Sequence, residues 1–79
     1  MILLLFGIAR EIVGAPRLTL PEPAAIQTVA DLRAWLVETY PAFSELRSLA
    51  VAVDQTYATD DQSLDSATEI ALIPPVSGG

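Results

Sequence analysis

The chain has 79 residues, ten acidic and four basic, and its net charge of −6 disfavours binding to nucleic-acid phosphates or to anionic membranes. All four basic residues are arginines, and the chain lacks lysine, histidine and cysteine, which excludes disulfides, Schiff bases and the usual neutral-pH general base. This length fits one domain, and the 52% of hydrophobic residues argue against disorder.

The acidity leaves two interpretations open, because it suits a basic protein partner but also simply aids solubility. The apolar start at residues 1–6 lacks the positively charged region of a signal peptide and is too short to span a bilayer. We therefore expect a cytoplasmic protein with neither a membrane nor a nucleic-acid partner.

Two strands and a helical turn are predicted in the first twenty residues. Residues 2–6 are all apolar, which predicts a strand near the centre of a sheet. Residues 10–13 are predicted to form a helical turn that Gly14 ends. Residues 17–20 alternate polar and apolar, which indicates a half-exposed strand.

The clearest predicted helix begins after Thr28, a good N-cap, with Asp31 three residues later in a capping-box position. Its apolar stripe comprises Val29, Leu32, Leu36 and Tyr40. A proline after the last of these disfavours further helix. One more turn at residues 42–46 would direct Phe43 and Leu46 inward.

Three more strands are predicted in the second half. Residues 49–53 form a buried strand, which a tight turn at 54–55 connects to a short strand at 56–58. A polar loop at 60–65 precedes the last strand, 69–73, which a proline ends. One main helix on one face of a small mixed sheet predicts an α+β roll.

This arrangement predicts an apolar sheet face that the helix does not cover. Two strands are apolar on both faces, so the second face would expose Ile2, Leu4 and Phe6, or their odd-numbered neighbours. A contiguous apolar patch of this kind usually marks a partner surface. The alternative is that the segments at 7–16 and 54–66 cover the face.

The sequence ends in Pro74-Pro75-Val76-Ser77-Gly78-Gly79. Glycine has no Cβ and fits slots that exclude other residues, while consecutive prolines favour an extended backbone. We therefore expect a single domain at 1–79 whose residues 74–79 form an extended, flexible tail presenting its terminal carboxylate. The alternative is a frayed end without a function.

Three segments together carry a resemblance to a known family. They are Leu5-Phe6-Gly7-Ile8-Ala9-Arg10-Glu11-Ile12-Val13-Gly14, Val51-Ala52-Val53-Asp54-Gln55, and residues 69–79 with their Pro-Pro-Val-Ser-Gly-Gly ending. The whole chain resembles the small subunits of molybdopterin synthase, which are ubiquitin-like β-grasp sulfur carriers. The family often has Asn where this chain has Asp54, and a glycine in the loop that is Ser66-Ala67-Thr68-Glu69 here.

The resemblance implies a reaction at the tail. A separate activating enzyme would use ATP to adenylate the carboxylate of Gly79, and a sulfur donor protein would convert it to a thiocarboxylate. The tail would then enter the large synthase subunit, in a 2:2 heterotetramer, and give its sulfur to a cyclic pterin precursor. Gly78 and Gly79 would fit channels that exclude a Cβ. The carrier itself would bind no cofactor and would not be catalytic alone.

The residues that we expect at the partner interface are Phe6, Tyr57, Ile73, Pro74, Pro75, Val76 and Ser77. Phe6 and Ile73 would end neighbouring central strands, close to the tail. Ordinary core packing is the alternative role for the first three. Arg10 and Glu11 would either form a surface pair or contact the partner, and the solvated pair is favoured, since exposed ion pairs contribute little.

Three other functions remain open. A sulfur carrier for thiamine or amino-acid biosynthesis would use the same tail chemistry. A ubiquitin-like modifier would join Gly79 to lysines of other proteins, and a pure binding module would tolerate loss of Gly78 and Gly79.

Overall fold

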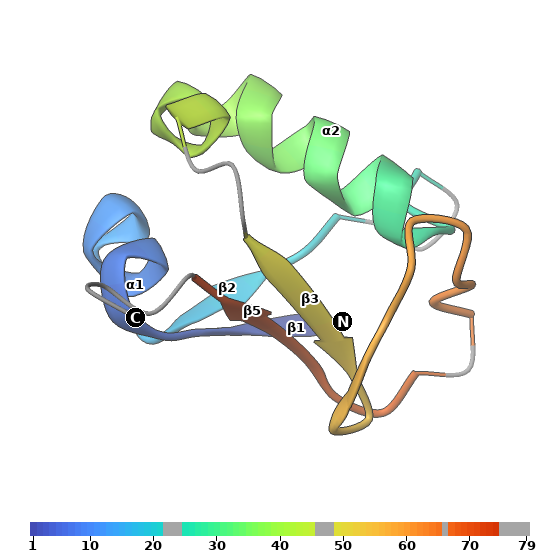
Figure 1. The fold of residues 1–79 in the computed structure, drawn as a ribbon. Coiled ribbons are helices and arrows are strands. Elements are labelled where there is room, and N and C mark those ends of the chain that lie inside the picture. The colour runs from blue at the N-terminus through green and yellow to red at the C-terminus, as the bar shows by residue number, and fades with distance from the viewer. Residues whose placement is uncertain (22–24, 46–48, 66, 75–79) are drawn as a thin grey trace.

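Five strands in one mixed sheet and two helices make up the fold of a computed structural model, which describes residues 1–21, 25–45, 49–65 and 67–74. The strands are β1 (Ile2–Leu5), β2 (Arg17–Thr19), β3 (Ala50–Val53), β4 (Thr56–Tyr57) and β5 (Ile70–Ile73). Their order across the sheet is β2-β1-β5-β3-β4 (Figure 1). The central strands β1 and β5 run parallel, and the other neighbouring pairs are antiparallel.

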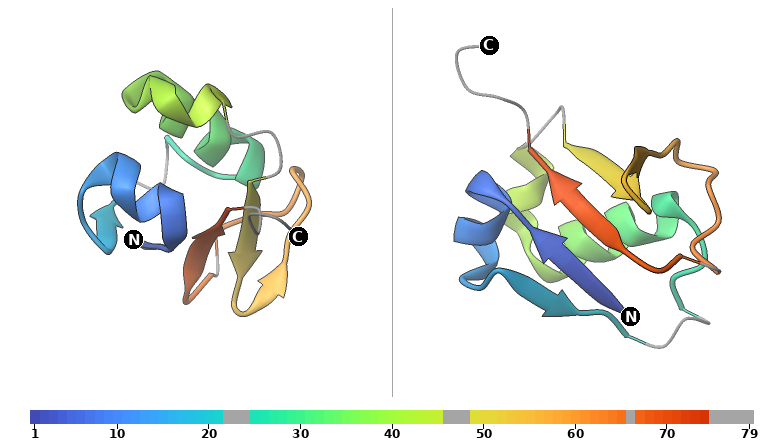
Figure 2. Two further views of the ribbon diagram at one scale, coloured as in Figure 1. Left: turned by 60° about the vertical axis from the view of Figure 1, so that its left-hand side comes forward. Right: turned by 90° about the horizontal axis from the view of Figure 1, so that it is seen from below.

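The helices lie on one side of this sheet. The main helix α2 (Val29–Thr39) and the 3-10 turn η1 (Pro41–Glu45) pass over one face, and the short helix α1 (Gly7–Val13) lies beside the end of β1 (Figure 1). Seen from below, the sheet stands in front of α2, and no described element covers its near face (Figure 2). This arrangement confirms the predicted α+β roll of the β-grasp type.

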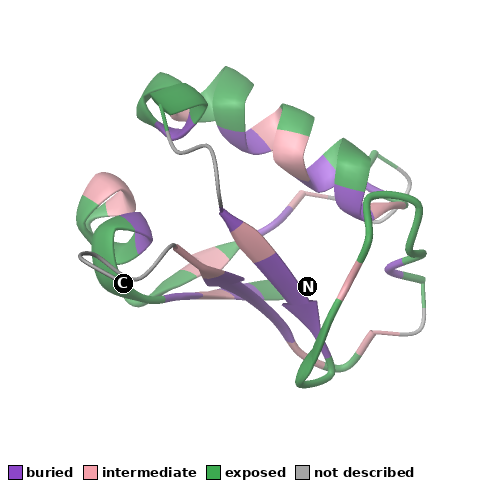
Figure 3. Ribbon diagram, viewed as in Figure 1, coloured by how far each residue is buried: buried purple, intermediate pink, exposed green. Residues whose placement is uncertain are grey.

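The core lies between the sheet and α2. Side chains alternate along each strand, so one set from every central strand points toward the helix. The strands contribute Leu3, Leu5, Val51, Val53, Ile70 and Leu72, and the helical layer contributes Val29, Leu32, Leu36 and Phe43, all of them buried. Figure 3 shows the buried segments in purple, and on β3 and β5 the purple run is continuous because Ala52 and Ala71, which point to the other face, are also buried. The predicted apolar stripe of α2 is therefore confirmed, with Tyr40 packed at its end.

The capping box at the start of α2 is confirmed. The Thr28 Oγ1 atom accepts a hydrogen bond from the Asp31 N–H at 3.2 Å. The Asp31 carboxylate in turn accepts the backbone N–H groups of Gln27 and Thr28, each at 3.1 Å. Both donors favour the charged carboxylate, and the Gln27 N–H contributes most, followed by the Thr28 N–H. They hold the pKa of Asp31 below its ordinary value.

The polar loop at 60–65 is fixed to the same helix end. The N–H groups of Val29 and Ala30 donate to the carbonyls of Gln62 and Asp60, at 3.0 and 2.9 Å. The Asp60 carboxylate also pairs with the Arg33 guanidinium at 2.9 Å. The loop therefore satisfies the first N–H groups of α2 and does not cover the open face of the sheet.

The segment after β1 differs from the prediction. The strand ends at Leu5, one residue early, and α1 begins at Gly7 instead of residue 10. The helix has no side-chain N-cap, since Phe6 holds that position, so its start gave no sequence signal. Its predicted end is confirmed, because Gly14 has a φ of 85° and donates to the Arg10 carbonyl.

The predicted turn after α2 is present as η1, and Phe43 is buried there as expected. Leu46 lies outside the described residues. The strands at 17–20, 49–53, 56–58 and 69–73 were predicted one residue too long at one end. These end residues have the composition of a strand and lie just beyond the paired ladder residues, although the N–H groups of Leu20 and Ala58 still donate to the carbonyls of Met1 and Val51.

Candidate functional site

One row of side chains crosses the open face of the sheet. Leu4 of β1 pairs with Ala71 of β5, Ala71 pairs with Ala52 of β3, and Ala52 pairs with Tyr57 of β4. Residues in register on adjacent strands project to the same face. Two methyl groups therefore lie at the centre of the row, and two large side chains lie at its ends.

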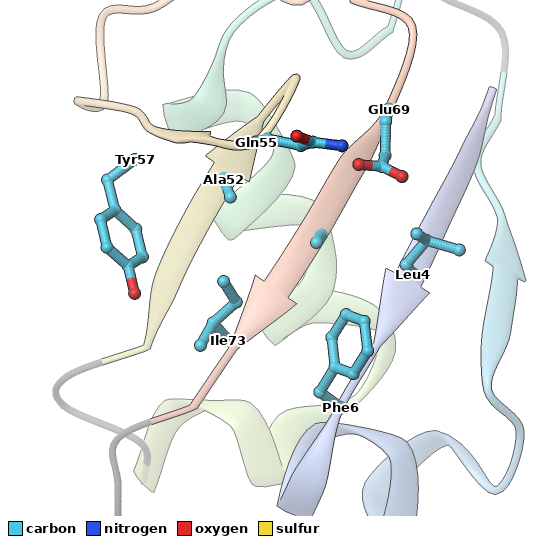
Figure 4. Close-up of a pocket in the computed structure, with 8 residues that line it drawn as sticks. Leu4, Phe6, Ala52, Gln55, Tyr57, Glu69 and Ile73 are labelled. Carbon is cyan, nitrogen blue, oxygen red and sulfur yellow. The ribbon is translucent and has the colours of Figure 1, made fainter.

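This difference in size leaves a hollow of about 300 Å³ above the two alanines. Phe6 and Ile73 stand at one end of it, while Gln55 and Glu69 stand together at the other (Figure 4). The lining is apolar except for the amide, the carboxylate and the Tyr57 hydroxyl. The face thus has a recessed apolar centre with one polar end.

The three predicted docking side chains all lie on this face. Phe6 is 51% exposed and Tyr57 is 70% exposed, while Ile73 is half-buried. Phe6 follows the last residue of β1 and Ile73 ends β5, and these strands are paired in parallel, so the expected adjacency of the two ends is confirmed. Core packing is thus the wrong description of Phe6 and Tyr57.

Gly7 lies against Pro74, the first residue of the predicted tail. Its φ is +54°, and a Cβ at this position would stand 3.0 Å from the Pro74 Cγ atom. A side chain there would be strained in its backbone and would press on the proline. The glycine therefore allows the end of β1 to approach the point where the chain leaves β5. Sequence reasoning assigned it no role, although the Phe-Gly pair after a strand was a usable signal.

The hairpin at the polar end forms without the Asn and the loop glycine that the resembled family often has at these positions. Asp54 and Gln55 have φ values of 50° and 69°, which is a two-residue turn of type I′. The Asp54 Oδ1 atom accepts the N–H groups of Thr68 and Glu69 at 2.9 and 2.8 Å. Among described residues other than glycine, only the two turn residues have a positive φ, so residues 67–69 need no glycine.

The open face offers binding groups and no evident catalytic cluster. Within the described ranges, no group of three or more acidic, histidine or cysteine residues is placed to hold a metal ion. In the same ranges, no helix is long and apolar enough to cross a membrane. The predicted tail residues Pro75, Val76, Ser77, Gly78 and Gly79 lie outside the described residues. Arg10 and Glu11 are both exposed, and among the described residues no ion pair joins them.

The recessed centre of the face was not predicted from the sequence. Ala52 lies between two buried valines, and Ala71 between two buried core residues of β5. Alternation along each strand could have placed both alanines opposite the core. Their adjacency depends on the register of β3 against β5, which the sequence pattern does not specify.

Comparisons with known proteins agree with this geometry. The model of the ThiS family matches residues 3–79. Molybdopterin synthase sulfur carrier subunits from Arabidopsis thaliana and Caenorhabditis briggsae are each 43% identical, over 96% of this chain and over 79% and 93% of their own lengths. The crystal structure of SAMP1 from Haloferax volcanii matches with a TM-score of 0.72 at 27% identity, covering 99% of this chain and 97% of that one.

A Pyrococcus furiosus structure, described as a candidate molybdopterin converting factor subunit 1, has a TM-score of 0.79 and covers 95% of both chains. At 20% identity, that likeness supports the fold alone. The family model spans nearly the whole chain, and the sequence relatives share one name. The chain therefore belongs to the ThiS family and is a relative of the molybdopterin synthase sulfur carrier subunits.

Proposed function

We propose that this chain is the sulfur carrier subunit of a molybdopterin synthase. Its last residue, Gly79, would carry sulfur as a thiocarboxylate to a cyclic pterin precursor, which becomes the dithiolene of molybdopterin. The observation that carries the proposal is the open apolar face, which lies directly beside the end of β5 and Pro74. A partner docked there would receive whatever follows Pro74. The names of the relatives support the same role.

The chemistry begins at an unreactive carboxylate. An oxygen of the Gly79 carboxylate attacks the α-phosphorus of ATP on the activating enzyme, pyrophosphate leaves, and an acyl-adenylate forms. Hydrosulfide delivered by the donor protein then attacks the acyl carbon, AMP leaves with the electron pair of the acyl–oxygen bond, and loss of the S–H proton gives the thiocarboxylate. The product is nucleophilic without a local base, which suits a chain that has no histidine, cysteine or lysine.

The tail sequence suits delivery into a narrow site. Gly78 and Gly79 lack the Cβ atoms that would widen the chain, so they could pass through a slot in the large subunit. Pro74 and Pro75 restrict the backbone before binding and reduce the conformational entropy lost when the tail is ordered. Val76 and Ser77 would line the entrance of that slot.

The partners follow from this chemistry. The large synthase subunit would supply the catalytic side chains and would bind two carriers in a 2:2 heterotetramer. The activating enzyme would supply ATP chemistry, and the donor protein would supply sulfur. The carrier contributes the docking face and the tail, and it needs no bound cofactor of its own.

Reconstitution tests the proposal. The thiocarboxylated chain is mixed with the large subunit and the cyclic pterin precursor, and dithiolene formation is followed. We expect product from the wild type and none from a chain extended by one residue after Gly79, since the extension moves the carboxylate. Equal product from the extended chain would contradict the proposal.

A protein-modifier function is the second candidate, because the similar Haloferax chain also appears under the name small archaeal modifier protein 1. A modifier would leave Gly79 in an isopeptide bond to lysines of other proteins. Mass spectrometry of tryptic digests from the native host distinguishes the two functions. A carrier for thiamine or amino-acid biosynthesis would instead restore sulfur transfer in those pathways and not with the synthase subunit.

A further inference from the structure

We propose that the hollow over Ala52 and Ala71 is a socket for one large apolar side chain of the partner, placed beside a basic group that meets Glu69. The inference rests on the proposed function, because the partner it describes is the large synthase subunit docked on this face. It adds a specific complementary shape and charge to a surface that would otherwise be only apolar.

The shape of the hollow depends on the paired alanines. Ala52 and Ala71 are only 6% and 9% exposed, so their methyl groups form the floor of the hollow. Leu4 and Tyr57 continue the same row and rise on either side. A flat partner surface would leave this space empty and lose the contacts of its lining. A projecting group is therefore required.

The volume of the hollow limits which partner group can project into it. About 300 Å³ is at the small end of the range for small-molecule sites, and this hollow is open to solvent over apolar walls. Phe6 and Ile73 at one end offer an aromatic and an aliphatic contact. Large aromatic or aliphatic anchors in such recesses dominate protein interfaces. A single side chain of this class fits better than a cofactor with polar groups.

The other end of the hollow carries the carboxylate of Glu69. Among the described residues, none donates a hydrogen bond to the Glu69 carboxylate, and the Gln55 amide lies beside it (Figure 4). The neighbouring Asp54 carboxylate already accepts two backbone N–H groups through one oxygen. With a chain net charge of −6, an Arg or Lys of the partner next to its apolar anchor would complete this end.

Filling the socket tests the shape. Ala52→Leu and Ala71→Leu place new side chains in the hollow of the open face, since neither buried alanine belongs to the core cluster between sheet and helix, while Ala34→Leu adds the same bulk on exposed α2. Titration calorimetry with the purified large subunit should show Kd raised about 30-fold for each socket variant, the factor that matches a hot-spot loss of about 2 kcal/mol. Ala34→Leu should bind as the wild type does.

Circular dichroism and thermal unfolding check that each free variant is folded. If either leucine variant is not folded, Ala71→Val is tested in its place. Unchanged Kd for folded socket variants would overturn the socket. Failure of the wild type itself to bind the large subunit would instead overturn the proposed function.

Removing the carboxylate tests the charge. Glu69→Gln should slow association with the large subunit at low salt, and the difference should fade at high salt, because screening removes steering between exposed charges. Glu38→Gln removes the same charge from exposed α2 and is the control. If Glu69→Gln associates as fast as the wild type at every salt concentration, the proposal that a basic side chain of the partner meets Glu69 is wrong.

Discussion

The ionised carboxylate of Asp31 stabilises the fold through the hydrogen bonds that it accepts at the start of α2. Two backbone N–H groups at the start of α2 donate to its carboxylate and lower its pKa from the ordinary 3.8. A carboxyl group with a lowered folded-state pKa stabilises the fold above the unfolded pKa, and this contribution is lost as pH falls through the folded pKa. The capping box is therefore an acid-sensitive element.

The first prediction compares Asp31→Asn with the wild type in urea unfolding across pH. The wild type should be more stable at neutral pH, and its advantage should shrink as pH falls below about 3.8, where the carboxylate becomes protonated. Glu38→Gln on the same helix is the control. An advantage that stays constant down to strong acid would contradict this assignment. Thr28→Ala, at the other half of the box, should cost about 1 kcal/mol.

The second prediction separates two glycines with different roles. Gly14→Ala forces a Cβ into a left-handed conformation with φ 85°, although nothing lies within 4 Å, so it should cost about 1 kcal/mol. Gly79→Ala should leave the thermal midpoint unchanged and abolish dithiolene formation, because the added Cβ blocks the slot in the partner. Thermal unfolding and product assays on both variants measure this. Full activity of folded Gly79→Ala would refute the steric role.

At the scale of elements, β1 and β5 place their exposed ends together. Phe6 and Ile73 follow from the parallel pairing of these strands, and both stand beside the recessed centre of the sheet. An exposed apolar surface of this kind favours burial against a partner, and it contributes little to the stability of the free chain. Its residues should therefore matter more for binding than for stability.

The third prediction substitutes Phe6→Asp and Ile73→Asp. A desolvated, unpaired charge at the contact should weaken binding to the large subunit by about 2 kcal/mol or more, while circular dichroism of the free chain changes little. Val37→Asp is the matched control, since Val37 is also an exposed apolar residue but lies on α2. If the α2 variant weakens binding and the two sheet variants do not, the docking face has been assigned to the wrong side.

The elements themselves were largely predictable, because their signals are local. Thr28 and Asp31 predicted the start of α2, and continuous apolar runs predicted the central strands. The start of α1 was not predictable, since Phe6 holds the N-cap position without a capping side chain.

The site was predictable only in part, for a different physical reason. Alternation along β1 grouped Leu4 and Phe6 on one face, but it did not tell whether that face or the opposite one is exposed. The pairing of Ala52 with Ala71, and the contact of Gly7 with Pro74, join segments that are distant in sequence. Such contacts depend on strand register and on tertiary packing, which composition and periodicity do not encode.

At the scale of the whole molecule, the face proposed for docking and the residue proposed for reaction lie in different parts of the chain. The chain contains no histidine, cysteine or lysine, and the described residues form a binding face without a catalytic cluster. Under the proposed function, larger proteins would recognise this face and act on the last residue, so the tail would carry the chemistry. The net charge of −6 suits a basic partner surface and also aids solubility.

Intact-mass measurement of the chain after incubation with ATP, a family activating enzyme and a sulfur source is the most direct test of this account. The account predicts the mass increase of one oxygen-to-sulfur exchange, located by fragmentation at Gly79 and absent when ATP is omitted. A relative such as the Arabidopsis carrier, treated in parallel, shows that the reagents are active. An unchanged mass for this chain under conditions that modify the relative would contradict the central claim.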